Sequence, residues 1–108
     1  MAKLELLQGT LDLLVLSSLR KEKLHGFAIA ERILRLSGEA LAVEEGSLYP
    51  ALYRLERQGM IEAEWGQSEN NRRAKYYGLT RAGRRRLEAE RAGWRRMSLA
   101  VSSVVESA

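Results

Sequence analysis

The chain has 108 residues, of which 45% are hydrophobic, and this size and composition are typical of one globular domain with a modest core. It contains no cysteine and one histidine, which excludes disulfides, thiolate metal sites and a Cys–His catalytic pair within one chain. The net charge is +4, but residues 72–96 hold 10 Lys or Arg against 2 Asp or Glu, a basic block that favours a polyanion as partner.

Two apolar segments predict the first two helices. We expect a buried helix over residues 11–20, with Thr10 as its N-cap and Asp12 in its first turn. After a turn at Gly26, a second helix is expected over residues 27–37, ending at Gly38. Its expected apolar face comprises Phe27, Ala30, Ile33 and Leu34.

A third helix, ending at Gly59, is predicted to have two different faces. Ser47 is the expected N-cap, with Pro50 in the first turn, where proline is tolerated. One face is an apolar stripe of Leu48, Leu52 and Leu55. The other is aromatic and cationic and consists of Tyr49, Tyr53 and Arg57, with Arg54 beside them. Such side chains reach phosphates and base edges, so this face predicts a DNA-reading helix; the alternative is an amphipathic helix with exposed tyrosines.

The remaining chain predicts a β-hairpin and one long helix. Residues 60–65 and 75–80 read as strands around a polar, basic tip, and Thr80 is expected to cap a helix that runs to about Glu106. The fold class is therefore mainly α with a small β-hairpin, a winged helix-turn-helix with an appended C-terminal helix. We expect residues 1–80 to form the DNA-binding part and residues 81–108 a dimerisation helix, within one compact domain.

The last predicted helix carries a heptad seam, which indicates a coiled-coil homodimer. The seam runs through Gly83, Leu87, Glu90, Trp94, Met97, Val101 and Val104, with Glu90 as its polar exception. The candidate dimer-interface residues are Leu87, Trp94, Met97, Val101 and Val104. A membrane-surface helix is the weaker alternative, because the cationic and apolar halves follow one another along the chain.

Four motifs occur together: GTLDLLVLSSL (9–19), HGFAIAERI (25–33), GSLYPALYRLERQGMI (46–61) and RRAKYYGLTRAG (72–83). In this order and at this spacing they resemble the PadR family of bacterial transcriptional regulators, in its short form with a single C-terminal helix. The resemblance implies a homodimer that binds a near-palindromic double-stranded DNA operator, usually as a repressor relieved by a small molecule.

The resemblance also assigns roles to individual residues. Ser47, Tyr49, Tyr53 and Arg54 match the recognition-helix positions, and Tyr76 matches a strand tyrosine that contacts the DNA backbone or belongs to the core. The complete candidate DNA-binding set is Ser47, Tyr49, Tyr53, Arg54, Arg57, Arg72, Arg73, Lys75 and Tyr76. Trp94 is a candidate platform for a planar aromatic effector, although a seam tryptophan more commonly packs a dimer core.

Other classes of function fit the residues less well. His25 belongs to a turn motif, the carboxylates form no acid–base pair and no Gly-rich phosphate loop follows a strand, so no enzyme, cofactor or metal is expected. A protein–protein adaptor is the alternative, but it would expose an apolar groove. An RNA-binding role is disfavoured because the A-form major groove is too narrow for a helix. With no membrane-length apolar run and no signal peptide, the expected location is the cytoplasm.

Overall fold

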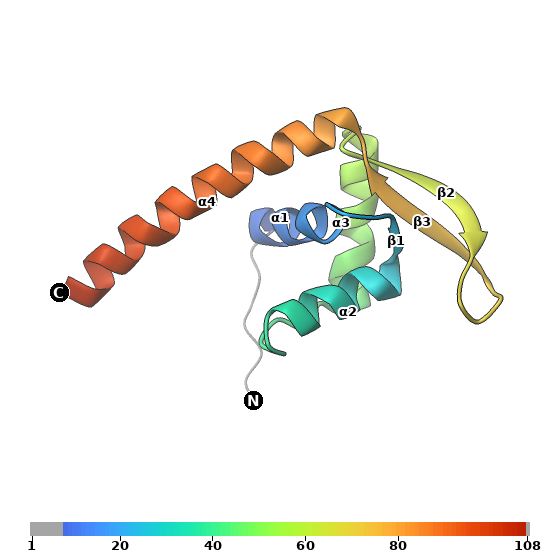
Figure 1. The fold of residues 1–108 in the computed structure, drawn as a ribbon, viewed down its shortest axis with the longest axis horizontal. Helices are drawn as coiled ribbons and strands as arrows, with labels where there is room; N and C mark the ends of the chain where they lie inside the picture. The colour runs from blue at the N-terminus through green and yellow to red at the C-terminus, as the bar shows by residue number, and fades with distance from the viewer. Residues whose placement is uncertain (1–7, 108) are drawn as a thin grey trace.

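The computed structural model of the protein describes residues 8–107. Within this range the chain forms four helices and one three-stranded antiparallel sheet (Figure 1). In chain order the elements are α1 Gln8–Ser18, β1 Leu24–His25, α2 Gly26–Leu36, α3 Glu45–Arg57, β2 Ile61–Gln67, β3 Arg73–Leu79 and α4 Arg81–Ser107. The expected fold class, mainly helical with a small hairpin and a long C-terminal helix, is confirmed.

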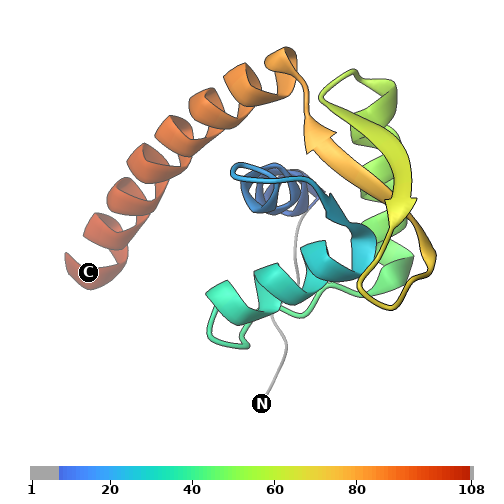
Figure 2. The same ribbon diagram turned by 45° about the vertical axis from the view of Figure 1, so that its right-hand side comes forward.

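Helix α1 lies at the centre of the core, against α2, α3 and the N-terminal part of α4 (Figure 1 and Figure 2). The elements bury the apolar stripes of their sequences against one another, which is the main favourable contribution to folding. The most deeply buried side chains are Val15, Leu16, Leu19, Ile29, Leu48, Leu52, Leu55, Ile61 and Leu87. The predicted apolar stripe of the third helix is thus part of the common core.

The hairpin of β2 and β3 extends away from the helices, and β1 adds a short third strand beside β3. Ile61 lies opposite Leu79, and His25 of β1 lies opposite Tyr76. Since side chains alternate between the faces of a strand, Ile61, Tyr77 and Leu79 all face the core, and burial raises the pKa of the Tyr77 phenol. Strand β1 has only two residues, too few for an alternating pattern to predict it.

Helices α2 and α3 end where the sequence predicts, at Gly38 and Gly59. Both glycines have φ in the left-handed region, at 63° and 75°. The amide of Met60 donates to the carbonyl of Leu55 (3.0 Å), which closes the last turn of α3. The chain is thereby turned directly from the end of α3 into strand β2.

Thr80 caps α4, as predicted. Its hydroxyl accepts a hydrogen bond from the amide of Gly83 (3.0 Å), which satisfies one of the free amides at the helix start. The same hydroxyl donates to the carbonyl of Gly59 (2.6 Å). One side chain therefore connects the first turn of α4 to the end of α3.

The predicted start of the third helix is wrong. Helix α3 begins at Glu45, and Glu44 occupies the N-cap position that the sequence assigned to Ser47. The carbonyl of Glu44 accepts from the amide of Ser47 (3.0 Å), so the first turn forms earlier than expected. Pro50 consequently lies in the second turn. Proline has no amide hydrogen to donate to the backbone carbonyl four residues before it. Because Pro50 is exposed, water can bond to that carbonyl instead.

Two expectations about the first helices are also wrong. Thr10 lies inside α1, which is already helical at Gln8, and so it is not the N-cap. Phe27 is 70% exposed, whereas the buried face of α2 carries Ile29 and Ile33. The reason is the helical period: Phe27 and Ile29 are two residues apart and so point to nearly opposite sides.

Helix α4 has an anchored part and a free part. Gly83 and Leu87 are buried in the common core, so the helix starts inside the winged unit. Further along, α4 runs away from the other elements (Figure 1). The seam residues Trp94, Met97, Val101 and Val104 are all exposed. The seam therefore consists of an intramolecular portion followed by an uncovered apolar portion.

Candidate nucleic-acid interface

The face of α3 opposite the core carries the predicted aromatic and cationic side chains. Tyr53 is 63% exposed, and Tyr49 and Arg57 are exposed on the same side of the helix. The guanidinium of Arg57 lies 5.7 Å from the centre of the Tyr53 ring, within the range of a cation–π contact. The structure thus brings Tyr49, Tyr53 and Arg57 together as one surface, which we call the α3 surface.

The N-terminus of α2 supports one edge of the α3 surface. A Cβ atom at Gly26 would lie only 2.7 Å from the Tyr49 hydroxyl, so the tyrosine ring packs directly on the glycine backbone. His25 caps α2, because its Nδ1 accepts a hydrogen bond from the amide of Ala28 (3.2 Å). This places the single histidine in the structural role that its turn motif suggests, next to the α3 surface.

Ser47 and Arg54 are placed differently from the other candidates on α3. Ser47 is exposed in the first turn, next to the carboxylates of Glu44 and Glu45. Arg54 points toward α1, where its Nη2 donates to Oδ1 of Asp12 at 2.6 Å. Its side chain is only 28% exposed. The structure therefore does not bring Arg54 into the α3 surface.

Asp12 is the residue that the sequence reasoning missed. Its side chain is 5% exposed and faces both Arg54 and Arg86, whose Nη2 lies 3.7 Å from Oδ2. The sequence signal for these contacts is a single carboxylate inside the apolar run LDLLVL, since a buried charge needs a partner of opposite charge.

The hairpin presents its basic residues on the side that faces α3. Lys75 Nζ lies 3.4 Å from Oε1 of Glu56 on α3, so the face of the hairpin that carries Lys75 is turned toward α3. The guanidinium of Arg73 lies 4.5 Å above the ring of Trp65, an exposed residue that the sequence did not single out. Arg72 is exposed at the tip, beside Asn71. Together these positions place cations next to the α3 surface.

Tyr76 lies on the opposite face of the hairpin. Side chains alternate along β3, and its hydroxyl donates to the carbonyl of Gln67 (3.0 Å) while its ring meets His25 edge-on. The same face carries Glu64, which pairs with Lys23 at 2.7 Å and raises the pKa of that lysine. The strand therefore separates Tyr76 from Arg73 and Lys75.

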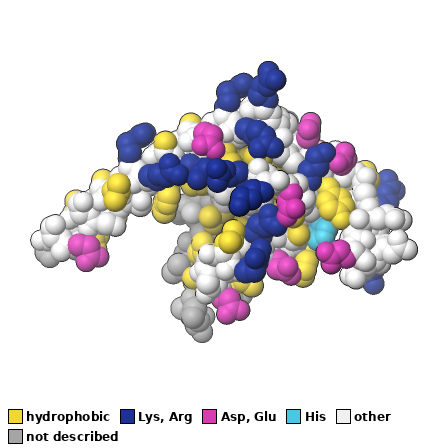
Figure 3. Space-filling view, viewed as in Figure 1, with side chains coloured by type: hydrophobic (Ala, Val, Ile, Leu, Met, Phe, Trp, Pro, Cys, Tyr) yellow, Lys and Arg dark blue, Asp and Glu magenta, His cyan; other side chains and the backbone are white. Residues whose placement is uncertain are grey.

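The basic block of residues 72–96 is divided between the hairpin and α4. Figure 3 shows Lys and Arg side chains along α4 as well as near the hairpin. Several of those on α4 have intramolecular partners: Arg86 bonds to Gln58 (2.7 Å), and Arg91 pairs with Glu88 (3.3 Å). The predicted basic block therefore does not act as one surface, and its hairpin portion is the part that adjoins the α3 surface.

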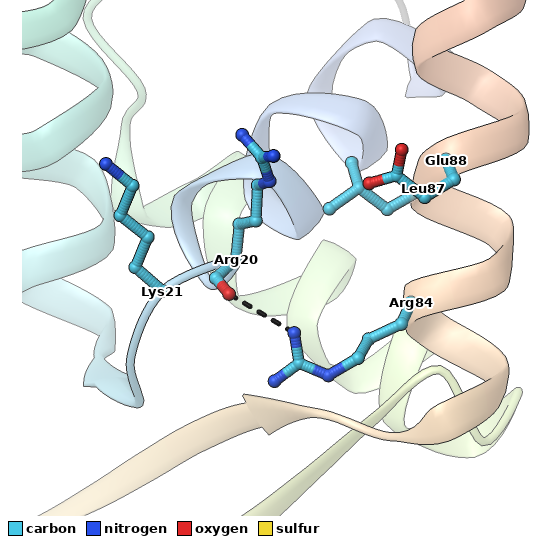
Figure 4. A pocket seen from close by; sticks show the side chains of 5 residues that line it. All are labelled: Arg20, Lys21, Arg84, Leu87 and Glu88. Atoms are coloured by element: carbon cyan, nitrogen blue, oxygen red, sulfur yellow. Dashed lines mark hydrogen bonds between the residues drawn. The ribbon is translucent and has the colours of Figure 1, made fainter.

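A hollow between the end of α1 and the start of α4 contains three more cations (Figure 4). Arg84 reaches across it and donates to the carbonyl of Arg20 at 3.2 Å. This contact satisfies the carbonyl of Arg20, which lies two residues beyond the end of α1. Arg84 therefore connects α4 to the chain that follows α1.

Within residues 8–107, no group of three or more His, Cys, Asp or Glu side chains is arranged to hold a metal ion. In the same range, none of the helices combines the length and apolarity that crossing a membrane requires.

Three packed helices with an exposed aromatic and cationic helix face, next to a basic hairpin, define a winged-helix regulator. The sequence profile described as the transcriptional regulator PadR-like family matches residues 15–89, more than half of the chain. The protein belongs to this family. That membership in a family of transcriptional regulators confirms the resemblance and agrees with the expectation that the chain is not an enzyme.

Several solved structures are similar to this chain and have the same fold. A PadR family regulator from hypervirulent Clostridium difficile is 31% identical, with a TM-score of 0.77 over 88% of this chain and 97% of the other. A Streptococcus mutans UA159 protein is 25% identical, with a TM-score of 0.84 over 97% and 94%. Bacillus subtilis PadR, solved in complex with operator DNA, is 26% identical, with a TM-score of 0.65. The match covers 73% of this chain and 45% of that PadR.

Proposed function

We propose that this PadR-family regulator binds an inverted-repeat operator as a homodimer and represses transcription in the cytoplasm. The observation that carries the proposal is the α3 surface of Tyr49, Tyr53 and Arg57, exposed next to Arg73 and Lys75 of the hairpin. The operator complex of Bacillus subtilis PadR supports the same assignment.

On this proposal α3 enters the major groove and the hairpin follows the DNA backbone. An arginine at the position of Arg57 has the donors for a bidentate contact with guanine, while the tyrosines contact backbone or thymine methyl groups. Arg72 and Arg73 neutralise phosphates, which contributes affinity without sequence information. Stacking on Trp65 holds Arg73 in one orientation, so less side-chain freedom is lost on binding.

The homodimer is proposed to form through the free part of α4. Trp94, Met97, Val101 and Val104 repeat at coiled-coil spacing and are uncovered, and a second copy of the same helix would bury them. Residues 1–80 then act as the DNA-binding part and residues 81–108 as the dimerisation helix, whose first turns also belong to the common core. Two α3 surfaces related by a two-fold axis would read two half-sites.

A small-molecule effector is a further part of the proposal. Trp94 is 53% exposed in the free part of α4, so two indoles would approach each other across a two-fold axis. Such a pair would either pack the dimer or sandwich a planar aromatic compound. A compound that prefers one dimer geometry would change operator affinity through that geometry.

The experiment that tests the proposed function is a selection from a pool of random duplexes with the full-length protein. We expect enrichment of an inverted repeat whose half-sites are about one helical turn, roughly 10 base pairs, apart. We call the enriched sequence the selected duplex. A pool that stays random through repeated rounds would favour the alternative, a winged-helix adaptor for another protein.

A further inference from the structure

Asp12 of α1 lies between the two helices that carry the proposed functions. Its Oδ1 lies 2.6 Å from Nη2 of Arg54 on α3, and its Oδ2 lies 3.7 Å from Nη2 of Arg86 on α4. The Asp12 side chain itself is almost fully buried. Arg54 lies 42 residues from Asp12 along the chain, so the bond between them is a tertiary contact. One carboxylate therefore faces a cation from each of the two helices.

The surrounding contacts complete a neutral cluster. Arg86 Nε lies 3.4 Å from Oε2 of Glu90, and its Nη1 donates to Oε1 of Gln58 at the end of α3. The cluster thus contains two arginines and two carboxylates, and it connects α1, α3 and α4. A buried carboxylate that loses its partners, or an arginine that loses its carboxylate, is strongly unfavourable, which makes the arrangement specific.

We propose that Asp12 is a positioning residue that fixes the α3 surface relative to α4 by binding Arg54 and Arg86 at the same time. In this assignment Arg54 holds the reading helix in place and Arg57 is the cation that faces DNA. Because α4 is one continuous helix from Arg81 to Ser107, the Asp12 contacts join the helix that carries the free apolar part to the reading helix.

The DNA arm of the test rests on the proposed function and uses the selected duplex and a random duplex. Asp12→Asn removes a negative charge, which by itself strengthens attraction to DNA. We nevertheless expect affinity for the selected duplex to fall at least about tenfold, while affinity for the random duplex changes less than about twofold. Glu88→Gln is the matched control, since it makes the same charge change at an exposed site on α4. We expect it to weaken neither complex.

A double-mutant cycle distinguishes positioning from direct reading by Arg54. If Arg54 acts through Asp12, the variant Asp12→Asn/Arg54→Gln should bind the selected duplex no more weakly than the weaker single variant. The double variant has the wild-type net charge, so electrostatics alone cannot produce this result. Losses that multiply would show that Arg54 contacts a base independently and would overturn the proposal. So would an Asp12→Asn variant that behaves like Glu88→Gln.

A second arm needs no DNA, so its failure is distinguishable from failure of the proposed function. In the free protein, Asp12→Asn should accelerate amide hydrogen exchange at least about tenfold in residues 52–57 and 84–88, with the hairpin unchanged. Unchanged exchange in both segments would overturn the proposal. If Asp12→Asn does not fold, Arg86→Gln replaces it in both arms, because this change leaves the Asp12–Arg54 pair in place. Its matched control is then Arg85→Gln, which removes the same charge at an exposed site on α4.

Discussion

A Cβ atom added to Gly83 would lie 1.9 Å from the carbonyl oxygen of Met60, so the first turn of α4 is in direct contact with the backbone that leads into β2. Together with the Thr80 cap, this contact fixes where α4 leaves the core. The direction of α4 is therefore set by its first turns, while its apolar C-terminal part stays uncovered.

Gly83→Ala should destabilise the protein although alanine is the better helix former. Relief of the overlap with the Met60 carbonyl requires α4 to shift, and we expect the free energy of unfolding to fall by about 1–3 kcal/mol in a denaturant titration. Gly93→Ala is the control in the same helix, because nothing lies within 4 Å of its added Cβ. That change should raise the free energy of unfolding by about 0.5–1 kcal/mol. Equal effects of the two changes would contradict the contact.

Met97→Glu combined with Val101→Glu should convert the proposed homodimer to a monomer. Both residues lie on the seam, where a pair of carboxylates would face the same pair of the partner. The matched control is Leu99→Glu with Ser102→Glu, which adds the same charge at exposed positions off the seam. Light scattering at micromolar concentration should give a monomer mass for the first variant and a dimer mass for the control. A dimeric first variant would place the interface elsewhere.

Arg57→Gln should weaken binding to the selected duplex more than binding to a random duplex. On the proposed function the interaction removed is a base contact, for which we expect about 1–3 kcal/mol, or roughly 5- to 150-fold in affinity. Fluorescence anisotropy with both duplexes at one salt concentration measures the ratio. If Arg57→Gln lowers both affinities equally, Arg57 contacts phosphate and the base contacts come from other side chains.

Arg72→Gln and Arg73→Gln should act on both duplexes alike. Each change removes one cation from the hairpin, so the slope of log affinity against log salt should decrease by about one for each phosphate that is no longer neutralised. Arg85→Gln, a change of the same charge on an exposed residue of α4, is the control and should leave the slope as it is. An identical slope for the hairpin variants and wild type would exclude the hairpin from the interface.

Trp94 should report on an effector if it forms a ligand platform. In a Trp65→Phe background, planar aromatic dyes should quench the remaining tryptophan fluorescence to saturation and weaken binding to the selected duplex over the same concentration range. Trp94→Ala should abolish the quenching and keep the dimer. Absence of saturable quenching with every dye, or a monomeric Trp94→Ala variant, would make Trp94 a packing residue.

The features that sequence predicted well are those encoded locally. Gly38, Gly59 and Thr80 mark helix boundaries because each acts through its own backbone conformation or a bond to a nearby amide. The aromatic and cationic pattern of α3 likewise needs only the helical period. The N-cap of α3 was harder to place than Thr80, since Ser47 and Glu44 both precede helical residues and the outcome depends on how the preceding chain enters the helix.

Contacts between distant segments lay beyond such reasoning. The pairing of Arg54 with Asp12 depends on how α1 packs against α3, and neither residue indicates the other in sequence. The stacking of Arg73 on Trp65 depends on the register of the hairpin. For the same reason the heptad pattern included Leu87, although this residue is already buried against its own domain.

Amide chemical shifts of the uniformly labelled protein, mapped on addition of the selected duplex, show directly whether α3 and the hairpin tip form the DNA-binding surface. We expect the largest changes at residues 46–57 and 68–73, with small changes at the outer hairpin positions Glu62 and Glu64. Changes centred on Glu62 and Glu64, or confined to α4, with residues 46–57 unaffected, would contradict this expectation.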